Sequence, residues 1–160
     1  KGTMASLAQQ PKNINPLADV QFKFEIAALP NTSFFVQTCN LPGIALEAQT
    51  IGAPRIQNFS RYTGVVTYEA LDIGFMIDEY LKNWQEIYEW MIGDVSKYTS
   101  AVLTIVSSSM NPTMEIHFKD IFPTSLSAIP FDSTTTDPVY QVATVSFNYT
   151  EYIIKNLLNN

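Results

Sequence analysis

The stretch at residues 78–93 places apolar and polar side chains with the period of an α-helix. Its apolar residues recur every three or four positions, which gathers six of them on one helical face: Tyr80, Leu81, Trp84, Ile87, Tyr88 and Met91. The polar side holds Lys82, Asn83, Gln85, Glu86 and Glu89. Asp78 is placed to cap the first amides, and Gly93 can take the left-handed conformation that ends a helix. We predict a helix that packs its aromatic face on a sheet and turns Glu86, Glu89 and Trp90 outward.

Most of the remaining chain alternates with the period of two that is typical of β-strands. The segments are residues 20–26, 33–40, 65–76, 101–106, 113–119 and 139–149. A Leu-Pro-Asn-Thr turn joins the first two, so they predict a β-hairpin. In the last segment Val145, Phe147 and Tyr149 form an apolar face, while Thr144, Ser146 and Asn148 form an uncharged polar face. The pattern therefore predicts a β fold with one helix laid against it.

Other segments follow neither period. Residues 45–63 hold scattered apolar residues and two of the chain's nine basic residues, so we interpret them as an irregular loop, either solvated or used for interaction. Residues 120–132 contain Pro123, which cannot donate to a ladder, so this piece should follow a sheet edge or bend across the sheet. We expect a flexible arm at residues 1–19, with residues 1–3 left from cloning, a single domain at 20–152 and a tail at 153–160.

Charge and cysteine content exclude several classes of function. Charged residues make up only 15% of the chain, which leaves large neutral polar faces suited to subunit contacts or a wet cavity. The net charge of −6 argues against tight or sequence-specific DNA binding, since no basic patch exists to release counterions. Cys39 is the single cysteine, and we expect a buried structural thiol. No signal peptide and no membrane-spanning run is visible, which predicts a soluble protein made in a cytosol with no membrane anchor.

The residues needed for catalysis or cofactor binding are missing from the pattern. A nucleophile–base pair would have to use His117, the only histidine, which lies among charged neighbours on the polar face of a strand. One histidine and one cysteine do not make a zinc site. The six glycines are scattered singly, so there is no phosphate-binding loop. We predict no enzyme, no metal and no cofactor.

Four strings, in this order along the chain, resemble those of the tail tube proteins of contractile-tailed bacteriophages. They are LPGI at residues 41–44, NWQEIYEWM at 83–91, FPTSLSAIPFD at 122–132 and VATVSFNYTEY at 142–152. The similarity runs from about residue 22 to residue 152. It implies a mainly β fold, an antiparallel β-sandwich or small barrel with one flanking α-helix. That fold is shared with the tube proteins of type VI secretion systems and with baseplate proteins that start a tube.

The resemblance also implies a function. A protein of this family is a structural virion protein, a tail tube subunit whose hexameric rings stack into a tube that conducts DNA without binding it specifically. The tail sheath, the baseplate and the tape measure protein are the expected partners, and assembly is expected in the host cytoplasm. The same resemblance leaves open a baseplate tube initiator and a tube terminator.

Within such a tube, three sets of residues acquire expected places. Inter-ring contacts are expected at Arg55, Arg61 and Tyr62, and sheath contacts at Glu86, Glu89 and Trp90. The lumen is expected to be lined by Thr144, Ser146 and Asn148, on a strand whose free edge joins the inner barrel of the ring.

Two other classes of protein remain open at this point. A small-ligand-binding β-barrel would need a closed apolar interior, whereas the wet faces here alternate with aliphatic residues. An adhesion module would explain the tyrosine and threonine content, although a secreted cellular module usually brings a signal peptide or disulfides.

Overall fold

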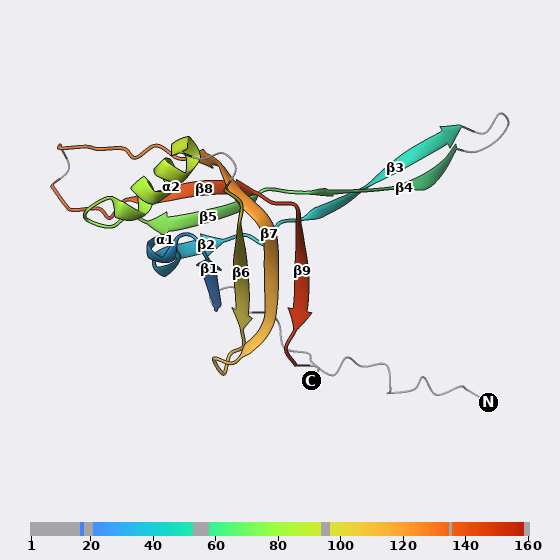
Figure 1. The fold of residues 1–160 in the computed structure, drawn as a ribbon, viewed down its shortest axis with the longest axis horizontal. Coiled ribbons are helices and arrows are strands. Elements are labelled where there is room, and N and C mark those ends of the chain that lie inside the picture. The colour runs from blue at the N-terminus through green and yellow to red at the C-terminus, as the bar shows by residue number, and fades with distance from the viewer. Residues whose placement is uncertain (1–16, 18–20, 53–57, 94–96, 135, 159–160) are drawn as a thin grey trace.

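The computed structural model describes residues 17, 21–52, 58–93, 97–134 and 136–158, without the side chains of residues 31, 34, 51–52 and 58–63. Its strands are β1 (Phe22–Ile26), β2 (Val36–Cys39), β3 (Ile44–Gly52), β4 (Asn58–Tyr68), β5 (Leu71–Met76), β6 (Thr99–Val106), β7 (Pro112–Leu126), β8 (Val142–Asn148) and β9 (Glu151–Asn156). The helices are α1 (Pro30–Phe34) and α2 (Lys82–Gly93). Seven strands form one antiparallel sheet in the order β1-β6-β7-β8-β5-β2, with β9 also paired to β7, and β3 and β4 form a separate two-stranded sheet (Figure 1).

The longest strand, β7, bends the sheet. Its first part pairs with β6 and β9, and its last part, from Phe122, pairs with β8. Between the two parts Asp120 has a φ of 52°, in the left-handed region, and the register with β8 slips after Pro123. A proline interrupts a ladder because it has no N–H to donate. Of the two expected courses, along a sheet edge or bent across the sheet, the structure shows the bend over residues 120–126, although Pro123 keeps a place in the ladder opposite Phe147.

The core lies between the two halves of the bent sheet. It combines buried side chains of β1, β6 and β7 with those of β5 and β8, and Ile87 from α2. Phe75, Phe118 and Phe147 are its largest fully buried side chains. Among the described residues, the interior between the two halves of the sheet is thus filled by apolar side chains. The predicted mainly β fold with one flanking helix is confirmed, with the short α1 as an addition.

Helix α2 is rotated from the predicted orientation. Asn83 and Ile87 are fully buried, Trp90 packs against the core with its ring 6.1 Å from that of Phe147, and Tyr80 is 74% exposed. The helix begins at Lys82 and not at residue 78, so Tyr80 precedes it, and Tyr88 is 46% exposed on it. The prediction that Tyr80 and Tyr88 are core residues and that Trp90 faces outward is therefore wrong. The physical reason is Asn83, whose amide is satisfied by backbone groups, so that a polar residue takes a core position.

The first predicted hairpin does not form. β1 pairs with β6 and β2 pairs with β5, because α1 separates them. Ser33 holds this turn, since its hydroxyl donates to the Leu29 carbonyl and accepts from the Ile26 amide. The predicted free edge on β8 is also wrong, because β8 lies between β5 and β7.

Two segments are more regular than their sequences indicate. Residues 45–63, interpreted above as an irregular loop, belong to β3 and β4 over the part that the structure describes. β9 continues to Asn156, beyond residue 152, where we expected a tail to begin. Both segments gain their regularity from pairing with a neighbouring strand, which their own apolar pattern does not encode.

Candidate assembly surfaces

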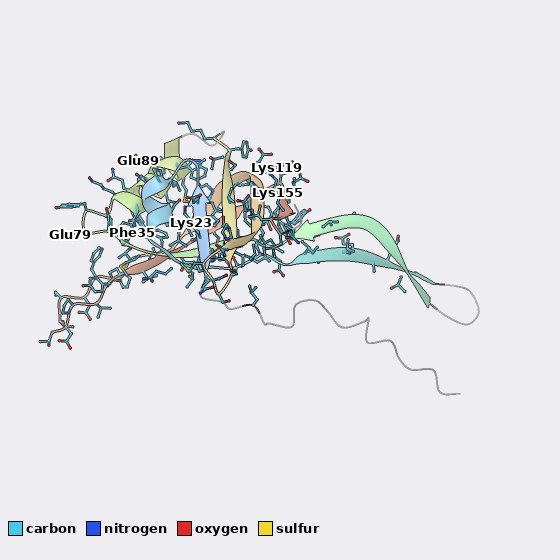
Figure 2. All side chains as sticks on the ribbon, turned by 90° about the horizontal axis from the view of Figure 1, so that it is seen from below. Lys23, Phe35, Glu79, Glu89, Lys119 and Lys155 are labelled. Atoms are coloured by element: carbon cyan, nitrogen blue, oxygen red, sulfur yellow. The ribbon has the colours of Figure 1, made fainter. Side chains whose placement is uncertain are left out.

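Strands β3 and β4 form a ribbon that projects away from the body of the molecule (Figures 1 and 2). In its basal part Ile44 lies opposite Tyr68 and Leu46 lies opposite Val66, so these side chains share one face. Ile44 is 59% and Leu46 57% exposed. A two-stranded ribbon is marginally stable on its own in water, and here one of its faces is apolar. This face, formed by Ile44, Leu46 and Val66, is exposed over the part of the chain that the structure describes.

Three tyrosines fix the base of the ribbon to the body. The Tyr149 hydroxyl donates to the Glu69 carbonyl at 2.8 Å, and the Tyr152 hydroxyl donates to the Pro42 carbonyl at 3.2 Å. The Tyr68 ring meets the rings of Tyr149 and Tyr152 edge-on, with centroids 5.8 Å and 5.5 Å away. Burial, with Tyr152, Tyr68 and Glu69 nearby, raises the pKa of Tyr149 to about 12. The ribbon therefore leaves the body in a defined direction.

The bend at the middle of the ribbon has its own cause. The register of β3 with β4 slips between Leu46 and Ala48, and the extra residues on β4 include Gly64 at a φ of 85°. Arg61 and Tyr62 lie just beyond this bulge, opposite Gln49 and Ala48. Two of the three predicted inter-ring residues, Arg61 and Tyr62, thus belong to the ribbon. The third, Arg55, lies outside the described residues.

A polar, nearly uncharged face covers one side of β2, β5 and β8. Thr144, Ser146 and Asn148 lie on it, since the alternate residues of β8 are buried. The Ser146 hydroxyl donates to Asp72 of β5, and Gly74 leaves space for the Thr38 hydroxyl, which a Cβ at that glycine would hit. No lysine or arginine occurs in these three strands. The predicted lumen residues are therefore brought together on one wet surface.

Helix α2 lies on the other side of β8, because it packs against Phe147, whose side chain points away from that polar face. Glu89 is exposed at the end of the molecule away from the ribbon and accepts a hydrogen bond from Gln85 at 2.7 Å (Figure 2). Glu86 is partly buried, and the Trp90 indole donates to the Lys97 carbonyl at 2.9 Å. Of the three predicted sheath residues, only Glu89 is fully presented outward.

A surface that the sequence patterns did not single out lies at residues 127–141, the segment between β7 and β8. It extends to the end of the molecule opposite the ribbon tip (Figure 1). Phe131 is 83% and Tyr140 81% exposed, and Val139 is exposed beside them. Asp132 accepts hydrogen bonds from the amide and the hydroxyl of Thr134, which lower its pKa and keep it charged. The clue available from sequence was two apolar stretches, IPF and VY, around a polar turn.

The described residues offer little for catalysis. They contain no group of three metal-ligating side chains, and no helix among them is long and apolar enough to cross a membrane. The His117 ring lies 3.0 Å from a Glu115 carboxylate oxygen on a strand surface. A hollow of about 790 Å³ beside α2, lined by Glu86, Trp90 and Tyr98 among others, opens to solvent. Cys39 is half-buried, short of the buried thiol that we predicted, and its burial raises the pKa of the thiol to about 12.

Known proteins resemble this chain in sequence and in fold. No family model matches the chain. The tail tube terminator protein of Enterobacteria phage T4 is 26% identical to it over 133 residues, which cover 74% of this chain and 76% of that protein. A chain of the anti-feeding prophage baseplate, from a 6-fold symmetrised structure, has a TM-score of 0.71 at 12% identity and covers 89% of this chain and 97% of its own. A chain of the anti-feeding prophage tube-terminating cap has a TM-score of 0.69 at 16% identity, covering 96% and 99%.

The chain has a tail-tube-like fold. The predicted resemblance is confirmed, since the chain is similar in sequence to a tail tube terminator protein and in fold to chains of the anti-feeding prophage baseplate and cap.

Proposed function

We propose that this tail-tube-like protein is a structural subunit that forms a hexameric ring at the end of a contractile tail tube, as a tube terminator. The single observation that carries the proposal is the unfinished surface of the subunit. Its ribbon exposes apolar side chains in a place where the isolated chain gains nothing from them, and neighbouring copies would cover them. The likeness to the T4 tail tube terminator protein supports the position at a tube end.

The two sides of β8 suit the inside and outside of such a ring. We propose that Thr144, Ser146 and Asn148 face the lumen. A lysine-free surface with Asp72 on it would let DNA pass without the phosphate contacts that bind a duplex. Helix α2 lies on the other side, so Glu89 would face outward toward a tail sheath. Trp90 is occupied by the core and is dropped from this sheath surface.

The sheet edges provide a second route to assembly. β1 and β9 are the outer strands of one half of the sheet, and β2 is the outer strand of the other half. Their unpaired backbone groups can join strands of neighbouring copies. We propose that Arg61 and Tyr62 of the ribbon, with Arg55, add a contact to another subunit. The finished ring would be part of the virion, assembled in the host cytoplasm with baseplate, sheath and tape measure proteins.

Two properties test the proposal: the formation of rings and the absence of unlimited stacking of those rings. Sedimentation velocity and negative-stain microscopy of the purified chain over a hundredfold concentration range should show monomers converting to single rings of six. Monomers at every concentration would overturn the ring proposal. The terminator role further requires that rings do not stack without end and that they bind the ends of preformed tubes.

A second role, the baseplate tube initiator, is favoured by one observation, the TM-score of 0.71 with a baseplate chain. The same preparation separates the roles. A terminator ring added to growing tubes should stop their elongation, whereas an initiator ring should raise the number of tubes. Long tubes of this chain alone would instead identify the ordinary tube subunit.

A further inference from the structure

The connection between β7 and β8, residues 127–141, is much longer than these two strands need. They are antiparallel neighbours with Leu126 opposite Val145, so a hairpin loop of about 2–5 residues would join them. The chain instead uses a segment without helix or strand over its described residues, and this segment extends past the body of the molecule (Figure 1). Long loops without structure of their own are uncommon in compact domains and are usually functional.

Hydrogen bonds fix both arms of the segment where they leave the sheet. The Ser127 amide donates to the Thr144 carbonyl, and the Thr144 amide donates to the Ser127 hydroxyl, both at 2.9 Å. On the other arm the Gln141 carbonyl accepts from the Ile77 amide at 2.9 Å. The outer part of the segment is therefore held out from the body on a defined base.

The outer part of the segment presents apolar side chains to water around a hollow. Every described residue from 130 to 140 is exposed. The large apolar side chains among them are Phe131, Val139 and Tyr140. The hollow has a volume of about 540 Å³ and is lined by residues of both arms, among them Phe131, Asp132, Asp137 and Val139. Exposed apolar groups around a concave surface are typical of a docking site.

Charge decides which kind of molecule fits this surface. The segment contains two acids, Asp132 and Asp137, and no basic residue. The hydroxyl and the amide of Thr134 donate to Asp132, which lowers the pKa of that carboxyl and keeps it charged. A second copy of this chain has the same net charge of −6 and would bring like charges together here. A positively charged molecule is attracted instead.

We propose that residues 130–132 and 136–141 bind an extended, basic segment of a different protein. An arginine or lysine of that segment enters the hollow and donates to the carboxylates of Asp132 and Asp137, with its cation against the Phe131 ring. An apolar neighbour of that basic residue covers the exposed side chains of the second arm. The site goes beyond the proposed ring and does not depend on ring formation.

The build of the segment favours such binding. Its fixed base means that the arms do not have to be brought together when the partner arrives. Pro130 and Pro138 flank the acidic turn, and proline limits the backbone freedom that is lost on docking.

Binding of a defined peptide to the full chain tests the proposal. The probe is a fluorescein-labelled peptide of three Arg-Leu-Pro repeats, whose prolines favour an extended backbone, and its neutral match has citrulline at each arginine. Fluorescence anisotropy should show the arginine peptide binding at least about tenfold more tightly than the citrulline peptide. Asp132→Asn/Asp137→Asn and Phe131→Ala/Tyr140→Ala should each weaken the arginine peptide about tenfold. Asparagine at position 132 still accepts from Thr134, so the turn is kept.

The matched control removes the same charge elsewhere on the surface. Glu25→Gln/Glu151→Gln, on β1 and β9, takes away two carboxylates that pair with surface lysines, and this variant should bind the peptide within about twofold of wild type. An equal loss of affinity in this control would show attraction to net charge alone and overturn the site. The absence of binding, or equal affinity for the two peptides, would also overturn it. Circular dichroism and thermal melting confirm that each variant is folded.

Sedimentation velocity separates this partner from a second copy of the chain. Phe131→Ala/Tyr140→Ala should assemble as the wild type does, because a different protein occupies the surface. Loss of assembly in this variant would show that a second copy covers the segment and would overturn the inference. A wild type that stays monomeric at every concentration overturns the proposed ring, whereas the peptide affinities still decide the fate of this site.

Discussion

Asn83 is the residue whose replacement tests the orientation of α2 most directly. Its side chain is fully buried, donates from Nδ2 to the Met76 carbonyl at 2.7 Å and accepts at Oδ1 from the Asp78 amide at 3.3 Å. The same oxygen accepts from the Trp84 amide at 2.9 Å. One amide thus joins the end of β5 to the start of the helix, where Asp78 Oδ1 also accepts from the Lys82 amide at 2.7 Å.

The expected loss follows from the groups left behind. In Asn83→Ala the Met76 carbonyl and the Asp78 amide both lose their side-chain partner in a partly buried place. A buried polar group without a partner costs about 1–3 kcal/mol, and both backbone groups are only partly buried, so the two together should lower the free energy of unfolding by about 2–4 kcal/mol. The removed volume adds a smaller packing loss.

A urea titration of three variants separates polar and packing effects. Asn83→Leu fills the space but still leaves both backbone groups unpaired, so it should be about as unstable as Asn83→Ala. Lys82→Ala, on the neighbouring exposed position, should stay within about 0.5 kcal/mol of wild type. Wild-type stability of Asn83→Leu would show that only volume matters at this site and would refute the account of the rotated helix.

Four further measurements address other parts of the molecule. Trp84 is only partly buried, stacks on Tyr88 and donates to the Ser127 carbonyl at 3.4 Å. Trp84→Ala should therefore lower the free energy of unfolding by about 2–3 kcal/mol, less than the loss of a fully buried tryptophan. A loss under about 1 kcal/mol would show that Trp84 does not pack against the core. The pKa of Tyr149, about 12, lies above the value of about 10 for an unfolded tyrosine, so the folded state keeps this proton longer. Its contribution to stability should be complete below pH 10 and be lost between pH 10 and 12, and Tyr149→Phe should remove the latest step of an absorbance titration. Cys39, with a pKa of about 12, should react with iodoacetamide at pH 8 more than about a hundredfold slower in the folded chain than in urea; equal rates would mean that the thiol is accessible. Amides of β8 should resist deuterium exchange in the isolated subunit because β8 is paired on both sides, whereas amides of β3 should gain protection only in rings.

The sequence predicted the parts of the fold in which one chain buries its own side chains. The alternation of β8 correctly placed Val145 and Phe147 in the core and Thr144 and Ser146 on the wet face. The two strands at residues 101–106 and 113–119 do pair, as β6 and β7. Here apolar positions are buried by the same chain, so period and burial agree.

The helix shows where such reasoning fails within one chain. Hydrophobicity predicted that Tyr80 and Tyr88 would be more buried than Asn83, and in the structure Asn83 is the buried residue and both tyrosines are exposed. An asparagine enters the core when backbone donors and acceptors satisfy it, and those groups come from Met76 and Asp78, outside the helix. Tyr80 remains exposed because it lies in the turn that precedes the helix, which begins at Lys82. Local spacing carries no information on either point.

Sequence-based prediction also fails for the ribbon, for a different reason that bears on function. Ile44, Leu46 and Val66 share a face because Ile44 and Leu46 are two positions apart and Leu46 lies opposite Val66. The bulge at Gly64, just beyond them, shifts the register of the rest of β4, so that strand does not alternate cleanly when its sequence is read alone. Burial normally makes apolar residues periodic, and over the part of the chain that the structure describes these three side chains stay 40–59% exposed. An apolar face that the chain itself leaves open implies that selection acted on a surface completed by another molecule. The segment of lowest predictability is therefore the one on which assembly should depend most, and in the absence of assembly its side chains would only add to the risk of aggregation.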